Sequence, residues 1–175
     1  DKLLGIYLLA RIVFSIFKLN LGLHLFLMSI GSLSIIAAVM MALIQHNGRE
    51  LLGYHAVSQV GYMVLGIGSG SVLAIAGGIF HLINNVIYKT GLFLSLGSVE
   101  KNVGTSDLDE MGGLGKKMPV TFAMTFIFAL AISGIPPLNG FFSKWAIYQG
   151  IFDFTSNLSA GFQIWALICL ILAIF

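Results

Sequence analysis

The chain has 175 residues, of which 58% are apolar and only 9% charged, so it has too few ionisable groups to cover a water-soluble globule. Its formal net charge of +2 forms no basic stripe and it has a single cysteine, Cys169, which excludes a nucleic-acid partner and a disulfide scaffold. The composition therefore predicts an integral, multi-pass membrane protein whose partner is the lipid bilayer.

The apolar runs predict an all-α bundle of transmembrane helices, because a helix needs about 20 apolar residues to cross about 30 Å of hydrocarbon. Both end runs are short for a complete span, so we interpret residues 1–175 as a single transmembrane fragment of a longer protein. The expected spans, in chain order, lie at about 1–18, 21–44, 50–68, 72–99, 119–154 and 160–175.

Residues 100–118 form the one substantial aqueous loop that the sequence predicts, because they carry seven of the acidic and basic side chains. If the spans alternate in direction, this loop and Arg49 share one face of the membrane, whereas the opposite face has only Lys18. The positive-inside rule predicts that the loop face is cytoplasmic.

The span expected at 119–154 is interrupted by consecutive prolines, Pro136 and Pro137, between Gly134 and Gly140. Proline lacks the N–H donor that a helix needs and disfavours helix in the residue before it. Either one span is broken near residues 134–140, or two short helices form a hairpin. Halves of about 16 residues favour the broken, tilted span, and its backbone must lie within protein or against a water-filled cavity.

Polar residues recur every four positions in the run that follows Gly77, at His81, Asn85 and Lys89. This spacing places them on one helical stripe about 12 Å long. An amine at this depth is a functional candidate, and the stripe is typical of one wall of a hydrated proton path. The alternative is that Lys89 reaches an interface while His81 makes an ordinary hydrogen bond between helices.

Further polar candidates lie outside that stripe. Lys144 follows the proline break by seven residues, where it forms either an ion site at mid-depth or, with Trp145, an anchor at the membrane surface. Tyr54 and Ser58 give the run 50–68 a polar face that serves either helix packing or a wet lining. No metal-ligand, nucleotide or hydrolase motif occurs, so we expect no metal, no cofactor and no catalytic centre in this chain.

Three segments, 49–62, 81–94 and 134–144, occur in an order and spacing that resembles the antiporter-like proton-translocating membrane subunits. That family includes subunits of respiratory complex I, of membrane-bound hydrogenases such as formate hydrogenlyase, and of Mrp-type sodium/proton antiporters. The resemblance implies a fold of about fourteen helices with two inverted repeats, each with one broken helix. The fragment would run from the eighth to the thirteenth helix.

The resemblance also implies roles for individual residues. Lys2 resembles the lysine that links the two half-channels, His81 and Lys89 resemble the histidine and central lysine of the eleventh helix, and Lys144 resembles the terminal lysine of the broken twelfth helix. Asn85 stands where many members have a second histidine, so water would bridge this gap in the path.

The function implied by the resemblance is proton translocation through a hydrated chain of buried lysine and histidine, in a redox-driven complex whose redox sites belong to other subunits. Expected partners are those other membrane subunits, protons and, in one version, Na⁺. The expected location is a bacterial or archaeal cell membrane or the mitochondrial inner membrane. Two alternatives are a sodium/proton exchanger of the Mrp type and a structural membrane subunit that conducts nothing.

Overall fold

The computed structural model describes residues 2–16, 20–156 and 159–174; Lys18 lies outside the described residues, as does the side chain of Lys2. Every regular element in these ranges is a helix, which agrees with the all-α prediction. In chain order they are α1 (Lys2–Ser15), α2 (Leu21–Leu43), α3 (Gly48–Gly68), α4 (Val72–Val103), the 3₁₀ turn η1 (Leu108–Glu110), α5 (Leu114–Lys117), α6 (Pro119–Ser133), α7 (Asn139–Thr155) and α8 (Ala160–Ile174).

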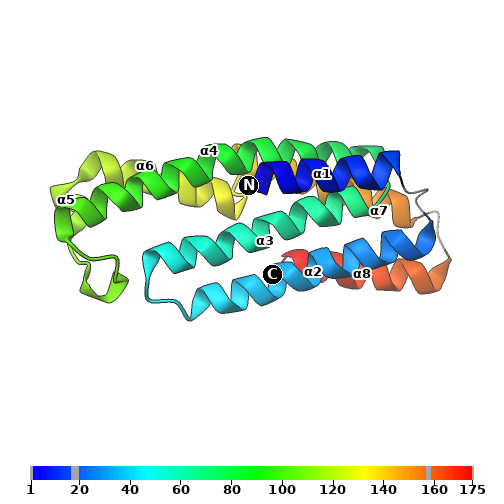
Figure 1. Ribbon diagram of the computed structural model, residues 1–175, viewed down its shortest axis with the longest axis horizontal. Coiled ribbons are helices and arrows are strands. Elements are labelled where there is room, and N and C mark those ends of the chain that lie inside the picture. The colour runs from blue at the N-terminus through cyan, green and yellow to red at the C-terminus, as the bar shows by residue number, and fades with distance from the viewer. Residues whose placement is uncertain (1, 17–19, 157–158, 175) are drawn as a thin grey trace.

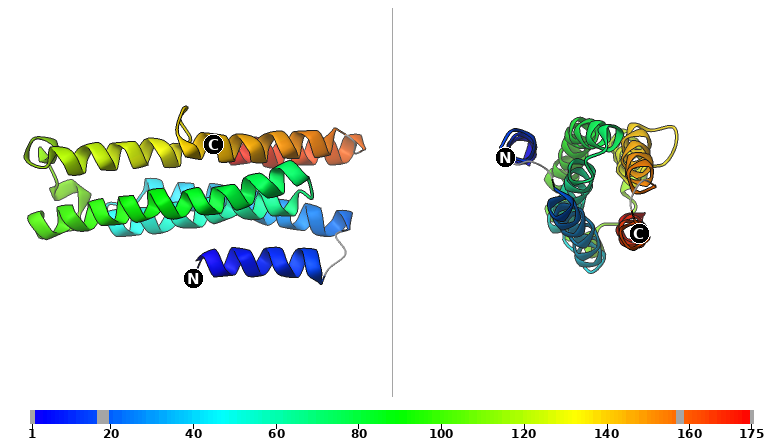
Figure 2. Two further views of the ribbon diagram at one scale, coloured as in Figure 1. Left: turned by 90° about the horizontal axis from the view of Figure 1, so that it is seen from above. Right: turned by 90° about the vertical axis from the view of Figure 1, so that its right-hand side faces the viewer.

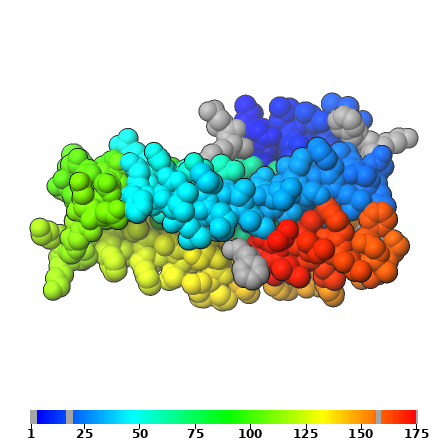
Figure 3. Space-filling view, turned by 90° about the horizontal axis from the view of Figure 1, so that it is seen from below, coloured from blue at the N-terminus to red at the C-terminus, as the bar shows by residue number. Residues whose placement is uncertain are grey.

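The helices run along one long axis of an elongated bundle (Figure 1). Neighbours α2, α3 and α4 alternate in direction and form the centre, and α1 lies at the edge, where it contacts α3. On the face shown in Figure 3, α8 lies along α2. α6 and α7 follow one another end to end along the same side of the bundle (Figure 2).

The outside of the bundle is strongly apolar. The apolar side chains of Val72, Leu94 and Val120 are at least 70% exposed. Many other large apolar side chains are also exposed on the surface. Among the described residues, α2 and α4 are long and apolar enough to cross a membrane by themselves. An apolar exterior of this extent is unfavourable in water and suits contact with lipid or with further helices.

Close helix contacts depend on glycine. A Cβ atom added to Gly61 would lie 2.7 Å from the backbone oxygen of Gly31, and one added to Gly31 would lie 2.9 Å from that of Gly61. Small residues that let two backbones approach closely are a common means of association between helices in membranes. This contact fixes α2 against α3 and so positions the polar face of α3.

The aqueous end of the bundle differs in one respect from the sequence prediction. The helix that contains the expected span 72–99 continues past it to Val103 and ends at Gly104, whose φ of 86° is left-handed. The extra turn carries Glu100, whose carboxylate accepts a 2.6 Å charged hydrogen bond from Arg49 at the start of α3. The ion pair and the glycine cap stabilise the turn at residues 100–103. From its charged residues alone, the sequence predicts that this segment belongs to the loop.

The segment after α4 is tied back to the turn between α2 and α3. The N–H of Leu108 donates to the backbone oxygen of His46 at 2.8 Å, and the N–H of Gly48 donates to that of Ser106 at 2.9 Å. The His46 ring also lies 2.6 Å from the Asp109 carboxylate. These contacts close one end of the bundle.

The helix that the prolines interrupt ends in a defined cap. Gly134 has a left-handed φ of 83°, its N–H donates to the backbone oxygen of Ala131, and the N–H of Ile135 donates to that of Leu130, both at 3.2 Å. This pair of bonds is the Schellman arrangement, in which glycine at the left-handed position satisfies two of the last carbonyl groups of a helix. The break therefore spans residues 134–138, and α7 starts at Asn139.

We expect the substitution Gly140→Ala to destabilise this junction. A Cβ atom at Gly140 would overlap the backbone oxygen of Ala131, so the two half-helices would have to separate. Overpacking against backbone costs about 1–3 kcal/mol. Thermal denaturation of the full-length protein in detergent should show a lower midpoint for Gly140→Ala. The control is Gly97→Ala, where no heavy atom lies within 4 Å of the added carbon; equal midpoints would contradict the prediction.

Candidate functional site

The polar stripe of α4 is buried in the centre of the bundle. His81 is 0% exposed, Asn85 6% and Lys89 7%. α3 and α4 are antiparallel, so the stripe faces α3 along its length. Lys89 lies opposite Leu52, and His81 lies opposite Gln59. The three side chains are therefore buried together along the contact between α3 and α4, and their role as the wall of a hydrated proton path stays a prediction.

His81 is held at both ring nitrogens. Its Nδ1 lies 2.8 Å from Oγ of Ser143 on α7, and its Nε2 lies 2.9 Å from Oε1 of Gln59 on α3. The same Gln59 oxygen accepts a 3.0 Å hydrogen bond from the Tyr88 hydroxyl. His81 thus joins three helices through hydrogen bonds that lie away from solvent, and its ring has no freedom to turn without breaking them.

Lys89 joins α4 to α3. Its Nζ donates to the backbone oxygen of Leu52 at 2.6 Å and lies 5.9 Å from the centre of the Phe93 ring. The side chain therefore points inward, between the helices, and does not reach along α4 to an aqueous surface. This geometry favours an interior lysine over one that reaches an interface, whereas His81 does make the hydrogen bonds between helices that the alternative predicts.

Asn85, between Lys89 and His81, has a buried acceptor that nothing else in the described part of the chain satisfies. Its Oδ1 is enclosed and accepts no hydrogen bond from the described residues. Leaving such a group unsatisfied costs about 1–3 kcal/mol. A buried acceptor of this kind is the setting in which proteins bind an internal water molecule.

Lys144 lies at the helix break. Its Nζ donates to the backbone oxygens of Ile132 at 2.9 Å and Ser133 at 3.4 Å, and lies 4.7 Å from the centre of the Tyr62 ring. The Schellman cap leaves these two final carbonyls of α6 available, and they form the negative end of the helix dipole. The end of α6, capped by Gly134, therefore provides the carbonyl groups that receive the amine of Lys144.

Tyr62 stands between Lys144 and His81. Its ring centre is 5.6 Å from that of His81, and its hydroxyl donates to the backbone oxygen of Ala173 in α8 at 2.6 Å. An aromatic face attracts a cation through its quadrupole. Lys144 and His81 are thus two titratable groups separated by one ring.

Most of the residues predicted from sequence come together, with two exceptions. Ser58 is buried and lies 3.5 Å from the Gln59 amide, so it joins the His81 cluster. Tyr54 is half-buried on α3 and, among the described residues, makes no hydrogen bond to the cluster. Lys2 begins α1, but its side chain lies outside the described residues.

Sequence reasoning missed several polar groups that the cluster uses: Gln59, Tyr62, Tyr88 and Ser143. The amide of Asn84 was also missed; it donates to the backbone oxygen of Asn139 at 3.0 Å and accepts from the Asn139 amide at 3.1 Å, which fixes the start of α7 on α4. One feature of the sequence could have identified Gln59 as part of this cluster. It is an amide inside an apolar run and follows His55 by four residues, on the same face of the helix. Uncharged polar residues also serve plain helix contacts, so this signal is weak.

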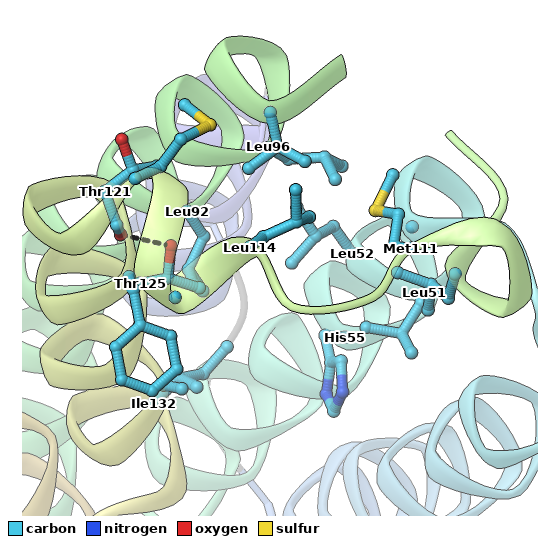
Figure 4. Close-up of a pocket in the computed structure, with 17 residues that line it drawn as sticks. Leu51, Leu52, His55, Leu92, Leu96, Met111, Leu114, Thr121, Thr125 and Ile132 are labelled. Carbon is cyan, nitrogen blue, oxygen red and sulfur yellow. Dashed lines mark hydrogen bonds between the residues drawn. The ribbon is translucent and has the colours of Figure 1, made fainter. Parts of the chain in front are cut away.

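A cavity of about 360 Å³ lies between α3, α4 and α6 at the end of the bundle where the aqueous loop folds back. Its wall is apolar apart from His55, Thr121 and Thr125 (Figure 4). Leu52 and Ile132 line it, and these two residues provide the backbone oxygens that bind Lys89 and Lys144. The cavity is therefore lined by the two residues whose backbone oxygens bind the amines, while Lys89 and Lys144 themselves do not line it. The described residues contain no cluster of three side chains able to hold a metal ion.

The fold and the buried groups define a helical membrane protein with titratable side chains in its interior. Residues 2–169 match the family described as NADH:quinone oxidoreductase/Mrp antiporter, TM. The chain belongs to this family of transmembrane, antiporter-like subunits, which confirms the resemblance inferred from the three motifs. It is accordingly an integral membrane chain.

Individual relatives agree with this assignment. The chain is 42% identical over 149 residues to a Na(+)/H(+) antiporter subunit of Alkalihalophilus pseudofirmus, covering 85% of this chain and 30% of the relative. It is 35% identical over 142 residues to formate hydrogenlyase subunit 3 of Escherichia coli, covering 75% and 23%. A chain of the Mrp complex from Dietzia sp. DQ12-45-1b has a TM-score of 0.85 at 28% identity, covering 98% and 32%. The chain thus spans about a third or less of these relatives.

Proposed function

We propose that this chain is part of a proton-translocating subunit of a redox-driven membrane complex, with Lys144, His81 and Lys89 as the groups that carry the proton. The observation that supports this most directly is the site of Lys144. Its amine rests on neutral backbone oxygens, and no carboxylate pairs with it among the described residues. A carbonyl accepts a hydrogen bond from both the charged and the neutral amine, so this site holds Lys144 in either protonation state.

The proposed path runs through the middle of the bundle. Lys144 exchanges a proton with the region around Tyr62 and His81, and water beside Asn85 connects that region with Lys89. Lys2 continues the path on the other side of Lys89 in this proposal, supported by the position of α1, which begins near the middle of the bundle's length (Figure 1). Charges about 8 Å apart at an effective dielectric constant of about 20 interact by about 2 kcal/mol, enough to pass a protonation change from one site to the next.

The helix break fits the same proposal. In this proposal α6 and α7 correspond to the broken helix of one inverted repeat in the family fold, and the segment between the end of α4 at Val103 and the start of α6 at Pro119 is the cytoplasmic loop. Broken helices in transporters place carbonyl groups at mid-depth, where they bind ions or cations. Here the cation is the Lys144 amine itself. Redox centres would belong to other subunits of the complex, which are the proposed protein partners.

Sodium/proton exchange is a second candidate, favoured by the 42% identity to a Na(+)/H(+) antiporter subunit. In that case this chain moves protons and another subunit handles sodium. A dry, purely structural role is disfavoured by the unsatisfied Asn85 oxygen and by two amines held inside the bundle.

The test uses the full-length subunit in its native complex, reconstituted into sealed vesicles with a pH-sensitive dye inside. We expect a redox substrate to drive proton movement without any sodium gradient. Proton movement that requires sodium and no redox substrate would favour the exchanger. The absence of proton movement under both conditions, in vesicles shown to be sealed and to hold active complex, would contradict both proposals.

A further inference from the structure

The hydrogen bonds around His81 determine which of its ring nitrogens carries the proton. The orientation of the Gln59 amide depends on Ser58. The hydroxyl of Ser58 donates its single proton to the backbone oxygen of His55 at 2.9 Å. Ser58 therefore presents a lone pair to its neighbour Gln59, whose amide nitrogen lies 3.5 Å away. This orients the NH₂ group of Gln59 toward Ser58 and its oxygen toward the pair of donors opposite.

Those two donors are the Tyr88 hydroxyl, at 3.0 Å from Oε1 of Gln59, and Nε2 of His81, at 2.9 Å. The Tyr88 oxygen also lies 3.4 Å from Nε2, but its single proton is directed to the nearer amide oxygen. An amide oxygen only accepts hydrogen bonds, so Nε2 must carry a hydrogen atom. A neutral imidazole has one N–H, and the bare nitrogen is therefore Nδ1. Nδ1 faces Ser143 of α7 at 2.8 Å, on the side of the broken helix.

Ser143 can exchange a hydrogen bond with the bare Nδ1 in either direction. Its hydroxyl lies within reach of three acceptors, His81 Nδ1 at 2.8 Å and the backbone oxygens of Gly140 at 3.1 Å and Asn139 at 3.4 Å. When His81 is neutral, the hydroxyl donates to Nδ1. When Nδ1 is protonated, it donates to the Ser143 oxygen, and the hydroxyl proton turns to Gly140.

We infer that Gln59 is a positioning residue that holds His81 as the Nε2–H tautomer, so that His81 gains and loses its proton only at Nδ1, through Ser143 on the α7 side. This deepens the proposed function and rests on it. In the transfer, the Ser143 proton passes to Nδ1 while the Ser143 oxygen takes one proton from water or from an amine on the α7 side. His81 gains one proton, the donor loses one, and Ser143 is unchanged.

Release of the proton from Nε2 is blocked, because the amide oxygen of Gln59 is too weak a base to take it and the ring cannot turn while both contacts hold. His81 therefore stores a proton and returns it by the nitrogen through which it entered. The proton does not cross the ring from Nδ1 to Nε2, so the onward transfer to Lys89 in the proposed path goes through water beside Asn85, with His81 as a proton store beside that path.

The first test is ¹⁵N magnetic resonance of the full-length protein in lipid, labelled at histidine, with the His81 signals assigned by their loss in His81→Asn. We expect protonated Nε2 and bare Nδ1 in the wild type. Gln59→Leu, which removes the acceptor, should shift the tautomer ratio by about tenfold toward Nδ1–H. Gln59→Glu should restore the original tautomer, because its carboxylate also accepts from Nε2. The control Gln45→Leu should leave the ratio unchanged.

The second test measures proton movement in vesicles for Ser143→Ala against Ser29→Ala, a serine of α2 that bonds only within its own helix. We expect the rate to fall about tenfold in Ser143→Ala and to be unchanged in the control. A wild type with Nδ1–H, or an unchanged tautomer in Gln59→Leu, would overturn the inference. The tautomer is measured independently of transport, so normal pumping by Lys144→Ala would defeat the proposed function without affecting the tautomer result.

Discussion

Replacement of Lys144 by alanine in the full-length subunit is expected to reduce proton translocation by about a hundredfold or more, because a group that gives and takes protons contributes on this scale. The complex should still assemble. The Gly134 cap satisfies Leu130 and Ala131 without the lysine, although Ile132 and Ser133 lose their donor. The measurement is the initial rate of proton movement in sealed vesicles, normalised to the amount of intact complex.

Two further variants separate charge from proton exchange. Lys144→Arg retains a cation for the carbonyls at the end of α6, but a guanidinium stays protonated, so we expect transport to remain blocked while thermal stability recovers. Lys117→Ala removes an exposed lysine of α5 and should pump normally. Normal pumping by Lys144→Ala, or recovery of pumping in Lys144→Arg, would show that Lys144 does not exchange protons.

The sequence predicted the part of the site that follows from one helix alone. His81, Asn85 and Lys89 share a stripe because their spacing matches the helical repeat, and no other information is needed for that prediction. Two prolines and two glycines likewise locate a helix break within a few residues. Whether the two halves continue in line or fold back is a tertiary property, and the length argument favoured the in-line arrangement that Figure 2 shows.

The contacts between helices could not be predicted in the same way. The amine of Lys144 binds carbonyls that lie eleven and twelve residues earlier in the chain, across the break. Periodicity cannot identify such a partner, because backbone oxygens are present at every position. Gln59 is similar, since its importance comes from His81 on a neighbouring helix. Tyr54 is half-buried on α3 and makes no hydrogen bond to the cluster among the described residues, so its assignment to helix packing or to a wet lining stays a prediction.

The second large effect is expected at Lys89, near the middle of α4. Lys89→Met keeps most of the volume of the side chain and removes the amine, so proton translocation should again fall by about a hundredfold. Loss of the donor to the Leu52 oxygen should also lower the free energy of unfolding, by about 1–3 kcal/mol. Both quantities are measured on the full-length protein, the first in vesicles and the second by denaturation in detergent.

Lys101→Met is the matched control, because it makes the same chemical change on the same helix at an exposed position near the aqueous end. Lys101→Met should translocate protons at the wild-type rate. Its free energy of unfolding should change by no more than about 0.5 kcal/mol, which is typical of surface substitutions. If Lys89→Met lost stability but pumped at the wild-type rate, Lys89 would be a structural link between α3 and α4. The proton path would then have to bypass the centre of α4, where Asn85 leaves its buried oxygen unsatisfied by the described residues.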